Sequence, residues 1–163
     1  MLQGMKAVRI DETDRKILSI LQAQGRLANA RIAEEVGLSP PTVLERIRKL
    51  EEKGIITGYT ALVDAPRVGL KAVVFVAITL SLHRAESIEI FRRKILDMPE
   101  VLECHHTTGE DDFLLKVVVP DIANYEDFLL HKLTRLEGIG KIKSAFVLST
   151  LKREVRLPLP EIS

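Results

Sequence analysis

The second half of the chain alternates between two hydrophobic patterns in an order that few folds can accommodate. Runs rich in β-branched residues predict four strands, at residues 72–82, 101–107, 113–119 and 141–150. Apolar residues three or four positions apart predict two helices, at residues 85–97 and 121–133. The faces expected to point inward are Ile88, Phe91 and Ile95 in the first helix, and Ile122, Tyr125 and Leu129 in the second. The resulting β-α-β-β-α-β order is that of a ferredoxin-like domain.

The pattern of the first predicted strand indicates that the chain forms a dimer. Nearly every residue of Ala72–Leu80 is apolar, so both faces of this strand are expected to be buried. Two helices can cover only one face of a sheet. The simplest cover for the other face is a partner copy, which predicts a homodimer. The alternative is that the linker and the C-terminal arm cover it.

A change of pattern divides the chain. Residues 10–55 show helix periodicity and few β-branched runs, unlike residues 72–150. Between them, Pro66 and Gly69 are spaced as in a turn or linker. We therefore predict a helical domain at 1–63, a linker at 64–71, a sheet domain at 72–151 and an extended arm at 152–163.

Three helices are predicted in the first domain. Asp11 can cap the first helix, and Gly25 fits the position that ends it. A second helix spans residues 29–36, and a third ends at Gly54. Residues 55–63 then alternate loosely and predict a short strand pair, or wing. The buried stripe of the third helix is expected to be Val43, Ile47 and Leu50.

The turn between the second and third helices has the residue types that a helix-turn-helix requires. Ala33 is small where the helices cross, Gly37 tolerates positive φ, and Ser39 can cap the third helix. Such a helix can enter the major groove of double-stranded DNA, with its first turns at base edges and its basic residues at phosphates. The predicted DNA-contacting residues are Ser39, Pro41, Thr42, Glu45, Arg46, Arg48 and Lys49. The alternative is an ordinary three-helix core with a solvated charged face; the turn spacing and the cap favour DNA binding.

A polar loop between two predicted strands is a candidate ligand site. A free amino acid presents an ammonium and a carboxylate, so it needs acceptors for one and donors for the other. Gly109 permits close backbone approach, threonines can donate, and carboxylates can accept. The candidate ligand-binding residues are Thr107, Thr108, Gly109, Glu110, Asp111 and Asp112. A plain hairpin turn would have the same residue types, so the residues alone leave both interpretations open.

Composition argues against several other classes of protein. The net charge of +1 disfavours a protein that coats polyanions. Cys104 is the sole cysteine, which excludes an internal disulfide and a multi-cysteine zinc site. His105 and His106 are adjacent in a predicted strand, so they point to opposite faces and cannot share a metal ion without a bulge. We therefore predict no metal, no cofactor and no catalytic residues.

The sequence also predicts a cytoplasmic protein without membrane contact. No apolar run reaches the roughly 18 residues that a membrane-spanning helix needs. Residues 1–9 lack the apolar core of a signal peptide.

Two sets of motifs resemble the Lrp/AsnC, or feast/famine, family of transcriptional regulators. In the first domain they are Asp11-x-x-Asp14-Arg15-x-Ile17-Leu18, Gly25-Arg26, Gly37-Leu38-Ser39-Pro40 and Glu45-Arg46-Ile47-x-x-Leu50-Glu51-x-x-Gly54-Ile55-Ile56-x-Gly58-Tyr59. In the second they are Val101-x-Glu103-Cys104 and Thr107-Thr108-Gly109-Glu110-x-Asp112-Phe113. Together they cover about residues 10–151.

The resemblance implies an α+β protein. Its expected parts are an N-terminal winged helix-turn-helix domain and a C-terminal ferredoxin-like domain that senses amino acids. That second domain is expected to dimerise, often assembling further into octamers, with the effector bound at subunit interfaces. One position departs from the family pattern, since Asp111 stands where the family usually has an aromatic residue. A polar or cationic effector is therefore favoured.

Two other functions are alternatives. Sirohaem decarboxylases resemble the same two-domain family, and such an enzyme would need basic and imidazole side chains around a tetrapyrrole. The available histidines are not clustered in the sequence: His83, His105, His106 and His131. The second alternative is a ligand-sensing module that has lost DNA binding. A transcriptional regulator without catalysis remains the leading prediction.

Overall fold

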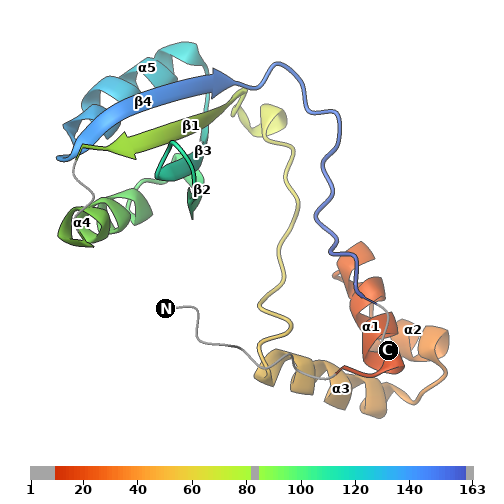
Figure 1. Cartoon of the computed structure of the whole chain (residues 1–163). Helices are drawn as coiled ribbons and strands as arrows, with labels where there is room; N and C mark the ends of the chain where they lie inside the picture. Colours follow the sequence, from red (N-terminus) through yellow and green to blue (C-terminus); the bar gives the residue numbers. More distant parts are fainter. Residues whose placement is uncertain (1–9, 82–84, 161–163) are drawn as a thin grey trace. The chain divides into compact units, whose positions relative to one another are not determined.

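The structure is a computed structural model that describes residues 10–81 and 85–160 (Figure 1). Residues 1–9, His83 and the last three residues of the predicted arm lie outside the described part. The chain divides into two compact units between Leu62 and Val63. We call the helical unit the head and the unit that follows it the sheet domain. The predicted arm belongs to the head, because residues 152–160 cluster with it.

Three helices form the head: α1 (Glu12–Ala23), α2 (Asn29–Val36) and α3 (Pro40–Glu52). As predicted, Asp11 caps α1, and it does so in a reciprocal capping box with Asp14. Gly25 follows the C-terminal cap residue Gln24, but its φ is not in the left-handed region. Gly25 therefore does not end α1 in the conformation for which glycine is preferred.

The turn between α2 and α3 has the predicted conformation. Gly37 has a φ of 69°, and the next N–H, of Leu38, donates to the carbonyl of Ala33 over 3.0 Å. Ser39 caps α3 by accepting from the N–H of Thr42. Pro40 follows at the first helical position, where no N–H donor is required. The head core buries Ile17, Leu18, Ile32, Ala33, Val43, Ile47 and Leu50.

The strand pair predicted for residues 55–63 is wrong: the structure has no strand there. Gly54, with a φ of 66°, turns the chain so that the N–H groups of Ile55 and Ile56 both donate to the carbonyl of Leu50. The two isoleucines then pack against the helical core. Their apolar side chains extend that core, which explains the alternation in the sequence without a second strand.

The sheet domain confirms the β-α-β-β-α-β order. Its strands are β1 (Ala72–Leu80), β2 (Val101–His106), β3 (Phe113–Val119) and β4 (Ile139–Phe146). Its helices are α4 (Ala85–Leu96) and α5 (Ile122–His131), with short 3₁₀ turns at Pro66–Val68 and Leu133–Arg135. The strands are antiparallel in the order β2-β3-β1-β4 (Figure 1). None of the described helices is long and apolar enough to cross a membrane.

The core of this domain lies between the helices and one face of the sheet. Phe91 of α4 packs on Phe113 of β3, with ring centroids 4.5 Å apart. The Tyr125 hydroxyl of α5 hydrogen-bonds Ser144 of β4. Ile122 was predicted to point inward but is 69% exposed, and that prediction is wrong. It is the first residue of α5, directly after the capping Asp121, and lies outside the buried stretch that Tyr125 begins.

The opposite face of the sheet is open in the sheet domain taken by itself. Alternate residues of β1 point to it, among them Phe75, which is 39% exposed. Its cross-strand neighbours are Lys116 of β3 and Ala145 of β4. The linker, residues 64–71, belongs to the same unit as the sheet and leaves Phe75 exposed.

Candidate DNA-binding and effector sites

The outer face of α3 presents the residues that the sequence assigned to DNA. Six of the seven are exposed, from Ser39 to Lys49, and Arg46 is half-buried. Arg48 pairs with Glu52 over 3.0 Å, and Lys49 pairs with Glu45 over 3.3 Å. Exposed pairs at this helical spacing contribute little stability, so a phosphate can replace the carboxylate at small cost. A groove between the start of α1 and α3 is lined in part by these side chains.

Arg46 is engaged within the head. Its Nη1 atom lies 2.7 Å from Asp11 Oδ2 and 2.8 Å from Asp14 Oδ1, so it joins α3 to the first turn of α1. The pKa of Asp11 is lowered, chiefly because the backbone N–H of Asp14 donates to its carboxylate, and Arg46 adds to this effect. Arg46 was predicted among the DNA-contacting residues. The structure shows that its guanidinium already has two carboxylate partners.

We expect Arg46→Ala to lower the free energy of unfolding of the head by roughly 0.5–1 kcal/mol. Because the pKa of Asp11 is depressed in the fold, its ionised form stabilises the head above its ordinary pKa of 3.8. That contribution is lost as the pH falls through the lower value of the folded state. The difference between wild type and Arg46→Ala should therefore shrink below about pH 4.

Hydrogen exchange of head peptides in denaturant, repeated across this pH range, measures the effect. Arg31→Ala is the matched control, since Arg31 forms an exposed pair with Glu34 inside α2 and should have almost no effect. Equal stabilities for wild type and Arg46→Ala at neutral pH would remove Arg46 from the α1–α3 contact.

The loop Thr107–Asp112 is a closed turn between β2 and β3. The N–H of Thr107 donates to the carbonyl of Asp112 over 2.9 Å, and its hydroxyl donates to the carbonyl of Asp111 over 2.8 Å. Gly109 has a φ of 124°, and a Cβ there would meet nothing within 4 Å. Glycine is therefore needed for its backbone conformation rather than for lack of space.

Asp112 fixes this loop to β1. Its Oδ2 accepts from the N–H of Leu80 over 2.7 Å, and its own N–H donates to the carbonyl of Ile78 over 2.8 Å. The register of β1 and β4 shifts between Thr79 and Leu80, so Asp112 binds β1 beside an irregularity. Asp112 was predicted to bind a ligand; in the structure its carboxylate makes a hydrogen bond that fixes the loop.

Asp111 attaches the other side of the loop to β1 and β4. Its Oδ2 lies 2.9 Å from Lys143 Nζ, and its Oδ1 accepts from the Thr79 hydroxyl over 3.0 Å. The hydrogen bond from Lys143 lowers the pKa of Asp111, and the same bond raises the pKa of Lys143. Asp111 therefore does not simply face water. Lys143 and Thr79 were not among the residues predicted for this site.

Two loop side chains present exposed polar groups. Glu110 is 91% exposed, with its carboxylate 3.6 Å from Lys143 Nζ. Thr108 is exposed, and its hydroxyl has no hydrogen bond within the described chain. The groups available to a ligand are these two side chains and the backbone around Gly109.

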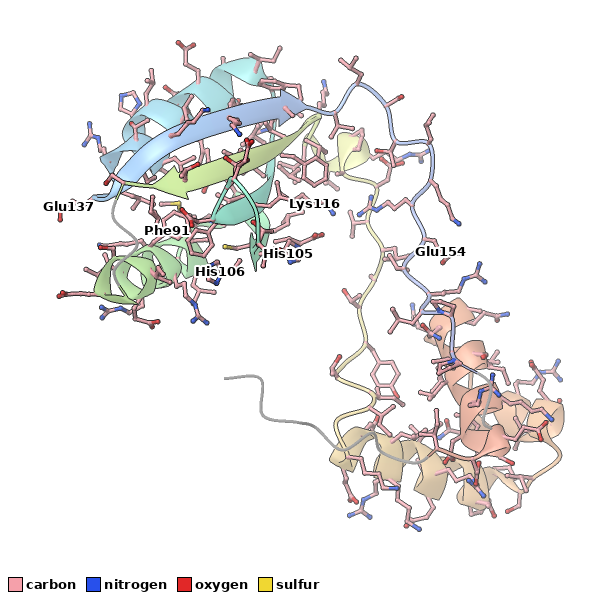
Figure 2. All side chains as sticks on the ribbon, in the orientation of Figure 1. Phe91, His105, His106, Lys116, Glu137 and Glu154 are labelled. Carbon is pink, nitrogen blue, oxygen red and sulfur yellow. The ribbon has the colours of Figure 1, made fainter. Side chains whose placement is uncertain are left out.

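The histidines do not converge on a site. His106 stacks on Phe113 on the helix-covered face, with ring centroids 4.9 Å apart. His105 points to the open face, 3.3 Å from Glu103, which also binds Lys116 (Figure 2). His131 lies on α5 beside Asp127. Across residues 10–81 and 85–160, no three ligating side chains form a group that could hold a metal ion.

Comparison with known proteins identifies the domain family of each unit. A model of winged helix-turn-helix DNA-binding domains matches residues 10–57, and a model of the Lrp/AsnC ligand-binding domain matches residues 73–157. The leucine-responsive regulatory protein of Escherichia coli is 39% identical over 148 residues, covering 91% of this chain and 90% of that protein.

Two solved structures share the whole architecture. A transcriptional regulator from Neisseria meningitidis in complex with L-Met has a TM-score of 0.88 at 36% identity, covering 92% of this chain and 97% of that one. An AsnC family regulator from Agrobacterium tumefaciens has a TM-score of 0.86 at 41% identity, with 91% and 97% covered. The relatives are regulators and not enzymes, so the decarboxylase alternative is not supported. The chain belongs to the Lrp/AsnC family of transcriptional regulators, with a DNA-binding head followed by a ligand-binding domain.

Proposed function

We propose that this regulator binds specific sequences in double-stranded DNA through α3 and that a small polar effector modulates this binding. The observation that carries the proposal is the exposed outer face of α3, which begins at a capped turn and contains Arg48 and Lys49. Because the partner is chromosomal DNA, we expect the protein to act in the cytoplasm.

The residues of α3 divide into three groups. Pro41 and Thr42 lie in its first turn, where base edges are read, together with the capping residue Ser39 and, one turn on, Glu45. Arg48 and Lys49 lie further along and are assigned to phosphates. Arg46 is assigned instead to positioning, because its bonds to Asp11 and Asp14 hold α3 against α1.

The open face of the sheet is proposed as the dimer interface. It combines apolar residues such as Phe75 with ion pairs such as Lys116–Glu103, so it can be self-complementary across a two-fold axis. Two heads related by that axis would read two half-sites separated by one or more helical turns, about 10 base pairs each.

Selection of bound duplexes from a random-sequence pool tests the DNA and dimer proposals together. We expect enrichment of an inverted repeat and a dimer mass by static light scattering at micromolar concentration. Phe75→Asp should reduce the mass towards a monomer, whereas Ile122→Asp, on the helix side, should leave a dimer. A monomeric wild type would contradict the interface, and a pool without enrichment would contradict sequence-specific binding.

The effector is proposed to be an amino acid or a related molecule held at the loop Thr107–Asp112. The related regulator solved with L-Met supports this chemical class. Here Thr108, Glu110 and the backbone at Gly109 offer a donor, a carboxylate and close approach. The paired Asp111 makes the loop polar, which favours an effector with a polar or cationic side chain. An effector at a subunit contact can change the heads only if it binds one arrangement better than another.

Calorimetric titration with the twenty amino acids tests this proposal. We expect heat from at least one polar or cationic amino acid and a weaker affinity in Thr108→Ala and in Asp111→Asn. Asp112→Ala is less informative, because it would also release the loop from β1. Asp127→Asn on α5 is the control and should bind as wild type. No heat from any amino acid would exclude this class of effector, and unchanged binding in both loop variants would place the site elsewhere.

A further inference from the structure

The segment that contains Leu157 and Leu159 lies along α1 of its own head (Figure 1). The side chain of Gln22 makes two hydrogen bonds to the backbone of Leu157: Oε1 accepts from the N–H over 2.6 Å, and Nε2 donates to the carbonyl over 3.3 Å. Two turns earlier on α1, Arg15 Nη2 donates to the carbonyl of Leu159 over 3.2 Å. The chain therefore runs antiparallel to α1.

One side chain of this segment supplies an apolar contact. Leu159 packs against the head core, whereas Leu157 is 71% exposed. The hydrogen bonds all go to backbone atoms of the segment, so they recognise an extended main chain and not particular side chains. This is how a peptide ligand is commonly held: main-chain bonds give affinity, and one buried side chain fixes the register.

The local sequence prepares the segment for this contact. Pro158 and Pro160 each restrict the residue before them, Leu157 and Leu159, to extended conformations. Less conformational entropy is then lost when the segment docks. The prolines also have no N–H, so the only amide hydrogens of residues 157–160 are those of the two leucines.

We propose that the outer face of α1, defined by Arg15 and Gln22, is a peptide-docking surface whose occupant is the chain's own segment 157–160. The head is then connected to the sheet domain twice, by residues 53–71 and by the docked segment that follows β4. Val155 also lines a groove together with the C-terminal end of α1 and residues 58–62, so the two connections meet there. A doubly connected head has fewer accessible orientations than one on a single flexible linker.

Trypsin cleavage of the full-length protein tests the docking. The bond between Arg156 and Leu157 lies at the Gln22 contact, whereas the bond after Lys152 precedes it and serves as a reference within the same chain. In Gln22→Ala we expect the initial rate at Arg156, relative to that at Lys152, to rise roughly three- to tenfold through loss of the two hydrogen bonds. Gln24→Ala is the matched control. Gln24 directly follows the last residue of α1, and its replacement should leave the ratio unchanged.

A second variant distinguishes loss of docking from a change in the stability of the head caused by Gln22→Ala. Leu159→Asp leaves every residue of α1–α3 intact and removes the apolar contact, so it should raise the same ratio. Equal ratios in wild type, Gln22→Ala and Leu159→Asp would overturn the docking proposal.

The consequence for DNA rests on the proposed function. We compare the affinities for two DNA duplexes whose half-sites are about five base pairs, or half a helical turn, further apart in one than in the other. Wild type should bind the two duplexes with different affinities, and the difference should be smaller in Leu159→Asp. Failure of wild type to bind DNA would contradict the proposed function, while the trypsin result would still decide the docking. If wild type and Leu159→Asp show the same ratio of affinities for the two duplexes although their trypsin cleavage differs, the docked segment does not restrict the orientation of the heads.

Discussion

Replacing Arg48 and Lys49 together with alanine is expected to lower the affinity for DNA about a hundredfold at roughly 0.1 M salt, because each phosphate contact contributes close to a factor of ten there. Both residues lie on the exposed face of α3, and their present partners, Glu52 and Glu45, are exposed carboxylates of the same helix. The slope of log affinity against log salt should fall by about one for each contact removed.

Fluorescence anisotropy of a labelled duplex over a range of salt concentrations measures both quantities. Arg92→Ala is the control, since Arg92 is a similarly exposed arginine that pairs with Glu89 on α4 of the sheet domain. It should change neither the affinity nor the slope. Unchanged affinity and slope in the double variant would show that α3 is not the DNA-contacting helix.

Replacing Ile47 with alanine is expected to destabilise the head by about 2–5 kcal/mol. Ile47 lies in the buried stripe of α3 between Val43 and Leu50, and its removal leaves a cavity in a small core. Because α3 is held against α1 and α2 by this stripe, loss of packing also loosens the helix that we propose binds DNA.

Hydrogen exchange of head peptides in the full-length protein measures this change without interference from the sheet domain. Leu44→Ala, in the same helix but 56% exposed, removes similar apolar volume and should cost far less. A loss of stability in Ile47→Ala no larger than in Leu44→Ala would remove Ile47 from the core.

Local sequence patterns predicted most elements because their causes are local. The cap at Ser39, the positive φ of Gly37 and the stripe through Val43 depend only on neighbouring residues, and all are found. The last strand was predicted too late, at 141–150 instead of Ile139–Phe146. Gly140 concealed its start, since glycine disfavours strands in general but is needed here for close packing on the backbone of Ser81.

The parts that the sequence did not predict depend on contacts between distant residues. A helical projection places Arg46 on a surface but contains no information about Asp11 and Asp14, more than 30 positions earlier. Lys143 could have been suspected as a loop partner only if the pairing of β4 with β1 had been known. The polar loop itself was located correctly, because a run of hydroxyl, glycine and carboxyl residues between strands is visible without that knowledge.

Because the segment that docks on α1 follows the sheet domain in the sequence, the head folds before this segment can bind to it during synthesis on the ribosome. Residues 10–62 leave the ribosome first and can form their three-helix core at once. The segment that hydrogen-bonds Gln22 appears only after the whole sheet domain has been translated. At usual translation rates this interval is about 5–20 s, far longer than a small helical domain needs to fold. The nascent head therefore exists for seconds with Arg15 and Gln22 uncovered, and Leu157 and Leu159 can bind them only after the sheet domain has been synthesised.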